Sequence, residues 1–207
     1  MNEFEIIKNY FQKIIKNNPS ALKLNDDVFF DKKNKLVFSI DTYNEGVHYI
    51  DFKNPNLIIK KIIRSSISDL ICKGVKPEFF FISASGNKKN FNKKNLKLIS
   101  KSIKQEQNKF NIKLSGGDTT FSKKSSFTIA SLGYSNKIIN RNKSKYHDDI
   151  YVTGNLGDSY LGLNIIKKKI NLFRKNIYFK NKYYKPEIPF KFYKYLSLFA
   201  NSSMDIS

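Results

Sequence analysis

The amino-acid sequence predicts an α+β protein with an N-terminal mixed β-sheet covered by helices, followed by the beginning of a second α/β domain. Two observations lead to this prediction. Segments with apolar residues at helical spacing alternate with short apolar runs of strand length over residues 1–137. A polar, basic linker then precedes one more strand-like run and two helix-like segments. We therefore expect an N-terminal domain at residues 1–137, and a linker with an incomplete C-terminal domain at residues 138–207.

The elements of the N-terminal domain follow from apolar periodicity and from the residues that begin and end helices. Pro55 is favourable at a helix start, and Gly74 and Pro77 end the same helix. Helical spacing predicts three helices, at residues 4–17, 55–73 and 92–108. Short apolar runs predict five strands, at residues 28–30, 36–40, 77–83, 110–114 and 127–132. From this order we expect the helices to cover one face of the sheet.

The C-terminal part begins with an apolar run at residues 150–153, which predicts a strand. The segment from Gly154 to Ser159 has the composition of a turn that opens a helix at about residues 159–168. A further helix is expected at about residues 189–200. The sequence given ends at Met204-Asp205-Ile206-Ser207, which has the appearance of an interrupted motif.

Two glycines and a carboxylate stand together at Gly116-Gly117-Asp118. A glycine pair lets the backbone turn tightly and present N–H groups to an anion, while Asp118 can hold a metal ion. A plain surface turn explains the same residues, with Asp118 bonded to its own backbone. We favour a phosphate and magnesium site because other acidic positions lie beside apolar residues, at Asp26-Asp27, Asp41, Asp69 and Asp205.

The positions of these carboxylates predict that they converge. Asp26 and Asp27 lead into the first expected strand, and Asp41 follows the second. Asp69 lies next to the apolar stripe of the long helix rather than on its lysine-bearing face. A buried carboxylate needs a partner, because burying an unpaired charge is very costly. A divalent cation would serve several of them at once.

The net charge of +21 suggests a polyanionic partner, but the composition argues against specific nucleic-acid recognition. Only three of the 38 basic residues are arginine, and the lysines are scattered through the chain. Specific readers of nucleic acid favour arginine, whose planar guanidinium makes two bonds at once. We therefore expect no specific nucleic-acid partner, and a basic nucleic-acid-binding module is the least favoured alternative.

Cysteine usage and hydropathy indicate the compartment. Cys72 is the only cysteine, so the chain has no internal disulfide, and a cysteine-based zinc site is disfavoured. The first residues lack the apolar block of a signal peptide, and no apolar run has membrane-spanning length. We expect a cytoplasmic protein without a membrane partner.

Seven short motifs occur in an order and spacing that resemble a known family. They read Asn25-Asp26-Asp27, Ser39-Ile40-Asp41-Thr42, Glu45-Gly46-Val47-His48, Ile67-Ser68-Asp69-Leu70, Ser115-Gly116-Gly117-Asp118-Thr119, Asp149 to Gly154 with Leu156-Gly157-Asp158, and Met204-Asp205-Ile206-Ser207. Together they resemble the thiamine-monophosphate kinases. These enzymes share a superfamily with aminoimidazole ribonucleotide synthetase and selenophosphate synthetase. The resemblance covers almost the whole sequence.

The resemblance implies ATP-dependent phosphorylation of thiamine monophosphate to thiamine diphosphate, with several Mg²⁺ ions and a homodimer that pairs through the N-terminal sheet. Under it, residues 1–137 are the metal- and ATP-binding domain. Metal ligation is expected at Asp27, Ser39, Asp41, Asp69, Asp118 and Asp205. ATP contacts are expected at Gly117, Asp118, Arg141 and Ser207, with Asp118 also catalytic. A thiamine monophosphate contact is expected at His48.

The expected chemistry explains a site rich in aspartate. Bringing two phosphate groups together requires charge neutralisation and alignment, which carboxylate-bound Mg²⁺ supplies. The acceptor phosphate has a second pKa of about 6, so at neutral pH it is already mostly ionised and needs no strong general base. We therefore expect direct in-line transfer without a phosphoenzyme intermediate.

The sequence also departs from the family pattern. Asn25 stands where the family usually has glycine, Ile40 where it usually has threonine, and Phe121 where it usually has arginine. The family motif continues beyond Ser207, so we expect either a fragment or a C-terminally truncated product. The alternatives are another ATP-using enzyme of the superfamily and an inactive truncated nucleotide binder.

Overall fold

A five-stranded mixed β-sheet forms the centre of the protein. The computed structural model describes residues 1–206. The strands lie in the order β1-β2-β5-β3-β4, with β3 and β4 parallel and all other neighbours antiparallel. Their bounds are Phe29–Asp31 for β1, Leu36–Asn44 for β2, Pro77–Gly86 for β3, Lys113–Phe121 for β4 and Ser126–Tyr134 for β5.

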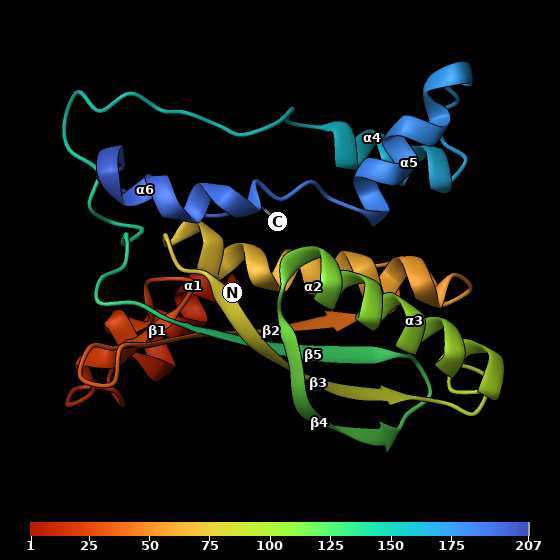
Figure 1. Cartoon of the computed structure of the whole chain (residues 1–207), viewed down its shortest axis with the longest axis horizontal. Coiled ribbons are helices and arrows are strands. Elements are labelled where there is room, and N and C mark those ends of the chain that lie inside the picture. The colour runs from red at the N-terminus through yellow and green to blue at the C-terminus, as the bar shows by residue number, and fades with distance from the viewer. Residues whose placement is uncertain (207) are drawn as a thin grey trace.

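Two long helices cover one face of this sheet, α2 at Pro55–Cys72 and α3 at Lys93–Phe110 (Figure 1). The isoleucines of α2 repeat at helical spacing and are completely buried, and they pack on inward-facing strand residues such as Phe80 and Ile129. Burial of such side chains is the main favourable contribution to folding. The predicted α+β class, with a mixed sheet covered by helices, is confirmed.

The opposite face of the sheet is open. Side chains alternate between the two faces of a strand, and in β2 the inward row is Val37, Ser39, Asp41 and Tyr43. Ile40 projects from the open face and is 60% exposed. Strand β4 forms one edge of the sheet, and all its residues are exposed. An open face and an open edge are both surfaces on which another chain can pair.

The glycine pair at 116–117 lies inside β4 rather than in a turn, which corrects the sequence prediction. The backbones of β3 and β4 approach so closely here that a Cβ on Gly117 would lie 1.8 Å from the carbonyl oxygen of Ile82. Glycine is therefore required for strand pairing. The prediction that Asp41 follows its strand is also wrong, because β2 continues to Asn44.

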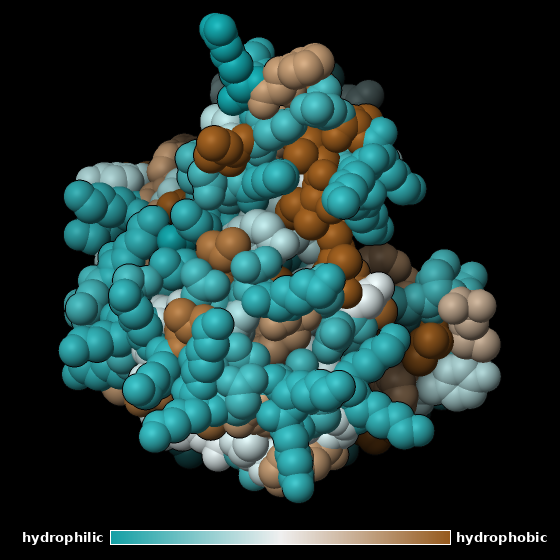
Figure 2. Space-filling model, turned by 90° about the vertical axis from the view of Figure 1, so that its right-hand side faces the viewer, coloured by the Kyte–Doolittle hydropathy of each residue, from teal (hydrophilic) through white to brown (hydrophobic). Residues whose placement is uncertain are grey.

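Three helices form the C-terminal part, α4 at Asp158–Ile166, α5 at Asn176–Tyr184 and α6 at Tyr193–Phe199. Helices α4 and α5 cross closely at Gly162, where a Cβ would lie 2.1 Å from the carbonyl oxygen of Phe179. Figure 2 shows hydrophobic residues gathered in the upper part of the molecule, where these two helices lie, above a largely hydrophilic body. Both α5 and α6 contact α2.

Two further predictions fail for lack of a partner. The expected helix at 4–17 is α-helical only at Glu3–Ile6 (α1) and continues as a π-helix at Ile7–Phe11, with its apolar residues exposed. A helix gains most of its stability from packing, and this one packs little. The expected strand at 150–153 is irregular and exposed, because no described strand lies beside it. Among the described residues, no helix has both the length and the apolar character needed to cross a bilayer.

Candidate metal centre

Four carboxylates from distant parts of the chain lie near one another at one end of α2. We call Asp27, Asp41, Asp69 and Asp205 the acidic cluster. Asp41 is on the inward row of β2 and lies near Asp69 on the buried side of α2. Asp205 lies in the C-terminal segment, where its Oδ2 accepts a bond of 3.0 Å from the Ser68 hydroxyl. The cluster therefore joins the sheet, a helix and two loops.

The local sequence explains why these polar groups face inward. Ser39 and Asp41 are two residues apart in β2, so both point toward α2. The Ser39 hydroxyl donates to Asp69 Oδ2, and both residues are buried. On the other side of Asp41, the Tyr43 hydroxyl donates to its Oδ2 at 3.1 Å. Each of these carboxylates thus has a neutral donor, but no described basic side chain pairs with Asp41, Asp69 or Asp205.

Burial and mutual repulsion oppose ionisation of the cluster. Burial, together with the charges of Asp41 and Asp205, raises the pKa of Asp69 to about 9. Burial also raises the pKa of Asp41 and the pKa of Asp205 above their ordinary value. Asp69 therefore retains its proton at neutral pH in the absence of a cation. A bound divalent cation would displace this proton and stabilise the charged carboxylates.

The donor chemistry fits Mg²⁺, a hard cation that prefers oxygen ligands. Carboxylates and the Ser39 hydroxyl supply oxygen atoms only, and buried or half-buried carboxylates without a basic partner favour a cation. As they stand, no three carboxylate, imidazole or thiol groups within residues 1–206 are arranged to hold one ion. Ion binding therefore requires side-chain movement within the cluster.

Asp27 differs from the other members because basic side chains already pair with it. Lys73 Nζ lies 2.8 Å from Asp26 Oδ1 and 2.7 Å from Asp27 Oδ2, the latter without hydrogen-bond geometry. Arg141 Nη2 lies 2.7 Å from Asp27 Oδ1. Burial alone would lower the pKa of the Lys73 ammonium, but its acidic neighbours outweigh burial and raise it. Sequence reasoning missed Lys73, which is one lysine among many in this chain.

Gly117 and Asp118 lie apart from the acidic cluster. Strand pairing places Asp118 beside Ser83 of β3, then Thr128 of β5, then Thr42 of β2. Paired residues share a face, and Thr42 and Thr128 bond to each other across the open face. Asp118 therefore projects from the open face, whereas the cluster lies on the helix-covered side. Within the described chain, the structure does not bring Asp118 to the other expected ligands.

The remaining expected residues have different surroundings. Arg141 contacts Asp27, as described above, on the side of the cluster that Lys73 also occupies. His48 lies in the loop after β2, where its Nδ1 accepts a bond of 2.9 Å from the Asn44 backbone N–H. The expected ATP contact at Ser207 lies outside the described residues.

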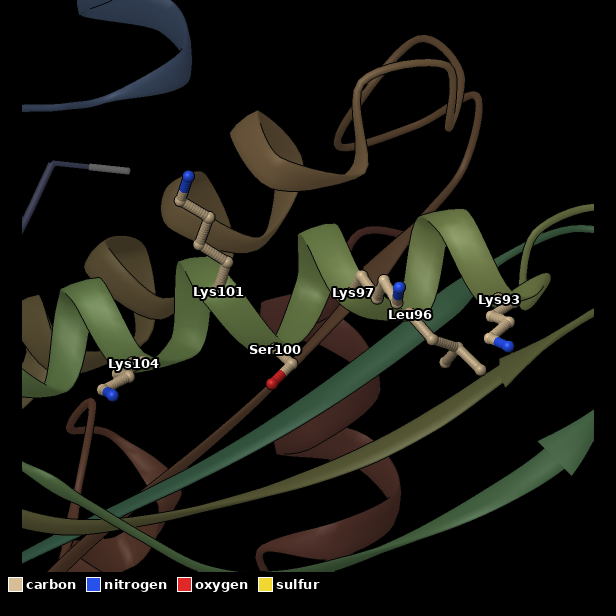
Figure 3. A pocket seen from close by; sticks show the side chains of 6 residues that line it. All are labelled: Lys93, Leu96, Lys97, Ser100, Lys101 and Lys104. Carbon is tan, nitrogen blue, oxygen red and sulfur yellow. The ribbon is translucent and has the colours of Figure 1, made fainter.

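A hollow also lies on the surface of α3, apart from the acidic cluster. It is lined by Lys93, Leu96, Lys97, Ser100, Lys101 and Lys104. Figure 3 shows that all six side chains come from this single helix and that Lys101 and Lys104 point in opposite directions. Lysines that diverge on one helix surface form no converging set of ligands. This hollow is a solvated helix face rather than a built site.

The fold and the cluster define an α+β protein with a carboxylate-lined candidate cation site on the helix-covered side of a mixed sheet. The chain belongs to the AIR synthase related protein family, because the model of that family's N-terminal domain matches residues 23–134. This match contains β1 to β5, both covering helices, and all of the acidic cluster except Asp205.

The chain is also similar to thiamine-monophosphate kinases. It is 34% identical over 215 residues to the enzyme of Buchnera aphidicola subsp. Schizaphis graminum, covering 100% of this chain and 65% of the relative. It is 35% identical over 187 residues to the enzyme of Buchnera aphidicola subsp. Acyrthosiphon pisum, covering 86% and 56%. The resemblance drawn from the sequence motifs is confirmed. The chain spans less than two thirds of the length of these curated relatives.

Solved structures show the same fold. The crystal structure of thiamine monophosphate kinase from Aquifex aeolicus has a TM-score of 0.86 and 23% identity, covering 100% of this chain and 67% of that chain. AaThiL complexed with AMPPCP and TMP has a TM-score of 0.85 at 23% identity. The described backbone therefore agrees with these structures over its whole length.

Proposed function

We propose that this chain acts in the ATP-dependent phosphorylation of thiamine monophosphate to thiamine diphosphate. One observation carries the proposal: a buried carboxylate, Asp69, meets two half-buried ones, Asp41 and Asp205, without a basic partner, in a chain that is 34% identical to a thiamine-monophosphate kinase. Charge neutralisation is the main requirement of phosphoryl transfer to a phosphate. An oxygen-lined cation site meets that requirement.

Asp41, Asp69 and Asp205, with the Ser39 hydroxyl, are the proposed Mg²⁺ ligands. Bound Mg²⁺ would offset the negative charge of the phosphates and align them. The chain's own task is to hold these oxygens in place. The neutral donors Tyr43 and Ser68 orient two of the carboxylates while leaving their charge uncompensated. The chain needs no strong base, because the acceptor phosphate is already mostly ionised at neutral pH.

The nucleotide and substrate contacts extend this proposal. We assign ATP contacts to Gly117, Asp118, Arg141 and Ser207, and a thiamine monophosphate contact to His48, from the family motifs. Transfer is direct and in line, without a phosphoenzyme. We also propose a cytoplasmic location, where a lone thiol such as that of Cys72 stays reduced.

A homodimer through the N-terminal sheet is the proposed assembly. The open sheet face carries exposed apolar side chains such as Ile40 and Phe81, and β4 offers a long unpaired edge. Asp118 projects from this face, so its assigned role depends on the second copy. Residues 138–207 are proposed to begin a second domain, because the sheet ends at Tyr134.

The decisive experiment follows product formation by the chain. The chain is incubated with Mg-ATP and thiamine monophosphate, and thiamine diphosphate is measured by chromatography. We expect product from the unaltered chain and a loss of at least about 100-fold with Asp69→Asn, the scale of a lost electrostatic contact in an active site. Asp51→Asn, which removes a half-exposed surface carboxylate, is the control. Absence of product from the unaltered chain would contradict the proposed function.

A further inference from the structure

Lys73 is a completely buried lysine at the C-terminal end of α2. Its ammonium reaches Asp26 Oδ1 at 2.8 Å and Asp27 Oδ2 at 2.7 Å, and it donates a bond of 2.8 Å to the backbone oxygen of Ser203. Burying an ammonium group is very costly unless partners compensate for the lost hydration. These three oxygens form a built site for one positive charge.

Basic and backbone groups contact both aspartates of this site. Asp26 Oδ2 accepts a bond of 2.9 Å from the Arg141 backbone N–H, and Asp27 Oδ1 lies 2.7 Å from Arg141 Nη2. Lys73 and Arg141 therefore balance both carboxylate charges. The other three members of the acidic cluster have no such partner among the described residues. Asp26 and Asp27, whose charges are balanced, thus adjoin Asp41, Asp69 and Asp205, whose charges are not.

The placement of Lys73 also links segments that are far apart in the sequence. Its backbone oxygen accepts a bond of 3.1 Å from the N–H of Ile139, while its side chain reaches Ser203. The helix end, the loop before β1 and the C-terminal segment therefore meet at one ammonium group. Oxygen ligands from separate segments around one positive charge are also what a structural cation requires.

We propose that the Lys73 ammonium is a built-in cation that takes the place of a divalent ion at Asp26 and Asp27. Rather than ligating metal, Asp27 pairs with Lys73 and Arg141, and divalent ions bind at Asp41, Asp69 and Asp205. The inference rests on the metal site of the proposed function. It adds that the chain binds fewer divalent ions than its acidic residues suggest, and that removal of Lys73 creates a new ion site.

The test counts the Mn²⁺ ions that the chain binds, by electron paramagnetic resonance titration. Lys73→Met keeps most of the side-chain volume and removes the charge, so this variant should bind one Mn²⁺ more than the unaltered chain. Divalent ions should also raise the melting temperature of Lys73→Met more than that of the unaltered chain. Lys143→Met removes an exposed charge from a hollow that Lys73 also lines, and it should leave the ion count unchanged. An unchanged ion count in Lys73→Met would overturn the inference.

Two variants keep the test decisive if Lys73→Met does not fold. Asp27→Asn, with Lys73 retained, should leave the number of ions and their affinity within about twofold of the unaltered chain; loss of an ion would show that Asp27 is a ligand. Lys73→Met with Asp26→Asn removes both charges and should return the ion count to that of the unaltered chain. If the unaltered chain binds no Mn²⁺, the proposed metal site fails, whereas a gained ion in Lys73→Met still supports the role of Lys73.

Discussion

Asp69 shows how one buried side chain links protonation, stability and cation binding. Its ordinary pKa of 3.8 is raised to about 9 by burial and by the neighbouring Asp41 and Asp205. The folded state therefore binds a proton more tightly than the unfolded state. The corresponding stability is fully present below about pH 4 and is lost as the pH rises through about 9. Divalent ions stabilise the ionised form of Asp69, so their binding offsets the stability that is lost as the pH rises.

We therefore predict that Asp69→Asn makes the metal-free chain less sensitive to pH. In a chelating buffer, the melting temperature of the unaltered chain should fall between pH 6 and 9, and that of the variant should fall less. Some slope should remain because Asp41 and Asp205 also have raised pKa values. Thermal melts followed by circular dichroism measure the difference. Equal slopes for both chains would contradict this role of Asp69.

At this scale the sequence singled out all four members of the acidic cluster, but not Lys73 as a counter-charge. Asp69 could be recognised because a carboxylate beside the apolar stripe of a helix needs a partner. Asp41 was singled out by its place near a strand end, although the strand continues past it. Lys73 could not be recognised, since one more lysine in a lysine-rich chain carries no signal until the loop with Asp26 is folded against it. The position of Asp118 depends on which face of β4 it occupies. The sequence could not predict that face, because the glycine pair indicated a turn where the strand continues.

At the scale of elements, one buried ion pair fixes α3 to α2. Arg64 Nε lies 2.7 Å from Glu106 Oε2, and Arg64 Nη2 donates to Glu106 Oε1 at 3.1 Å. Both side chains are buried, and Arg64 Nη1 also donates to the backbone oxygen of Pro186 at 3.2 Å. The pair thus connects the two covering helices and the segment that precedes α6.

We predict that Glu106→Gln destabilises the fold by about 3–5 kcal/mol, because it leaves the buried guanidinium without a counter-charge. Replacing both residues with apolar side chains, Arg64→Met with Glu106→Leu, should cost less than the sum of the two single changes. Urea unfolding measures each free energy. Additive single and double effects would contradict a coupled pair.

The long helices and strands were predictable because the spacing of their apolar residues matches the faces that they bury. Helices α2 and α3 and the inner strands have apolar residues at the spacing that their burial requires. The segments at 4–17 and 150–153 have similar periodicity but lack a described partner, so their local pattern is not sufficient. The predicted strand at 110–114 overlaps only the first two residues of β4. The rest of β4 was missed because its glycines disfavour a strand locally and only the neighbouring backbone requires them.

At the scale of the whole molecule, the open sheet face predicts self-association. Ile40 is 60% exposed and Phe81 is 36% exposed on this face, beside the unpaired edge of β4. Ile40→Glu should shift the chain from dimer to monomer, because a charge would be buried at the contact. Light scattering after size-exclusion chromatography gives the molecular mass.

Ile177→Glu supplies the matched control for this prediction. Ile177 is 75% exposed, but it lies on α5, away from the sheet. The control should leave the molecular mass unchanged and retain the far-ultraviolet circular dichroism spectrum of the unaltered chain. A monomeric unaltered chain, or a dimer that persists in Ile40→Glu, would contradict pairing through this face.

The position of Cys72 gives the chain its own chemical reporter. Its Sγ lies 3.1 Å from the backbone oxygen of Asp69, the residue is 9% exposed, and burial raises the pKa of its thiol. The Cys72 thiolate attacks a colorimetric disulfide reagent, forms a mixed disulfide and releases a coloured thiolate. Because Cys72 is buried, this reaction requires opening of the helix end. Because the chain has no other cysteine, the rate at which the colour develops measures how often the end of α2 opens beside Asp69 and Lys73.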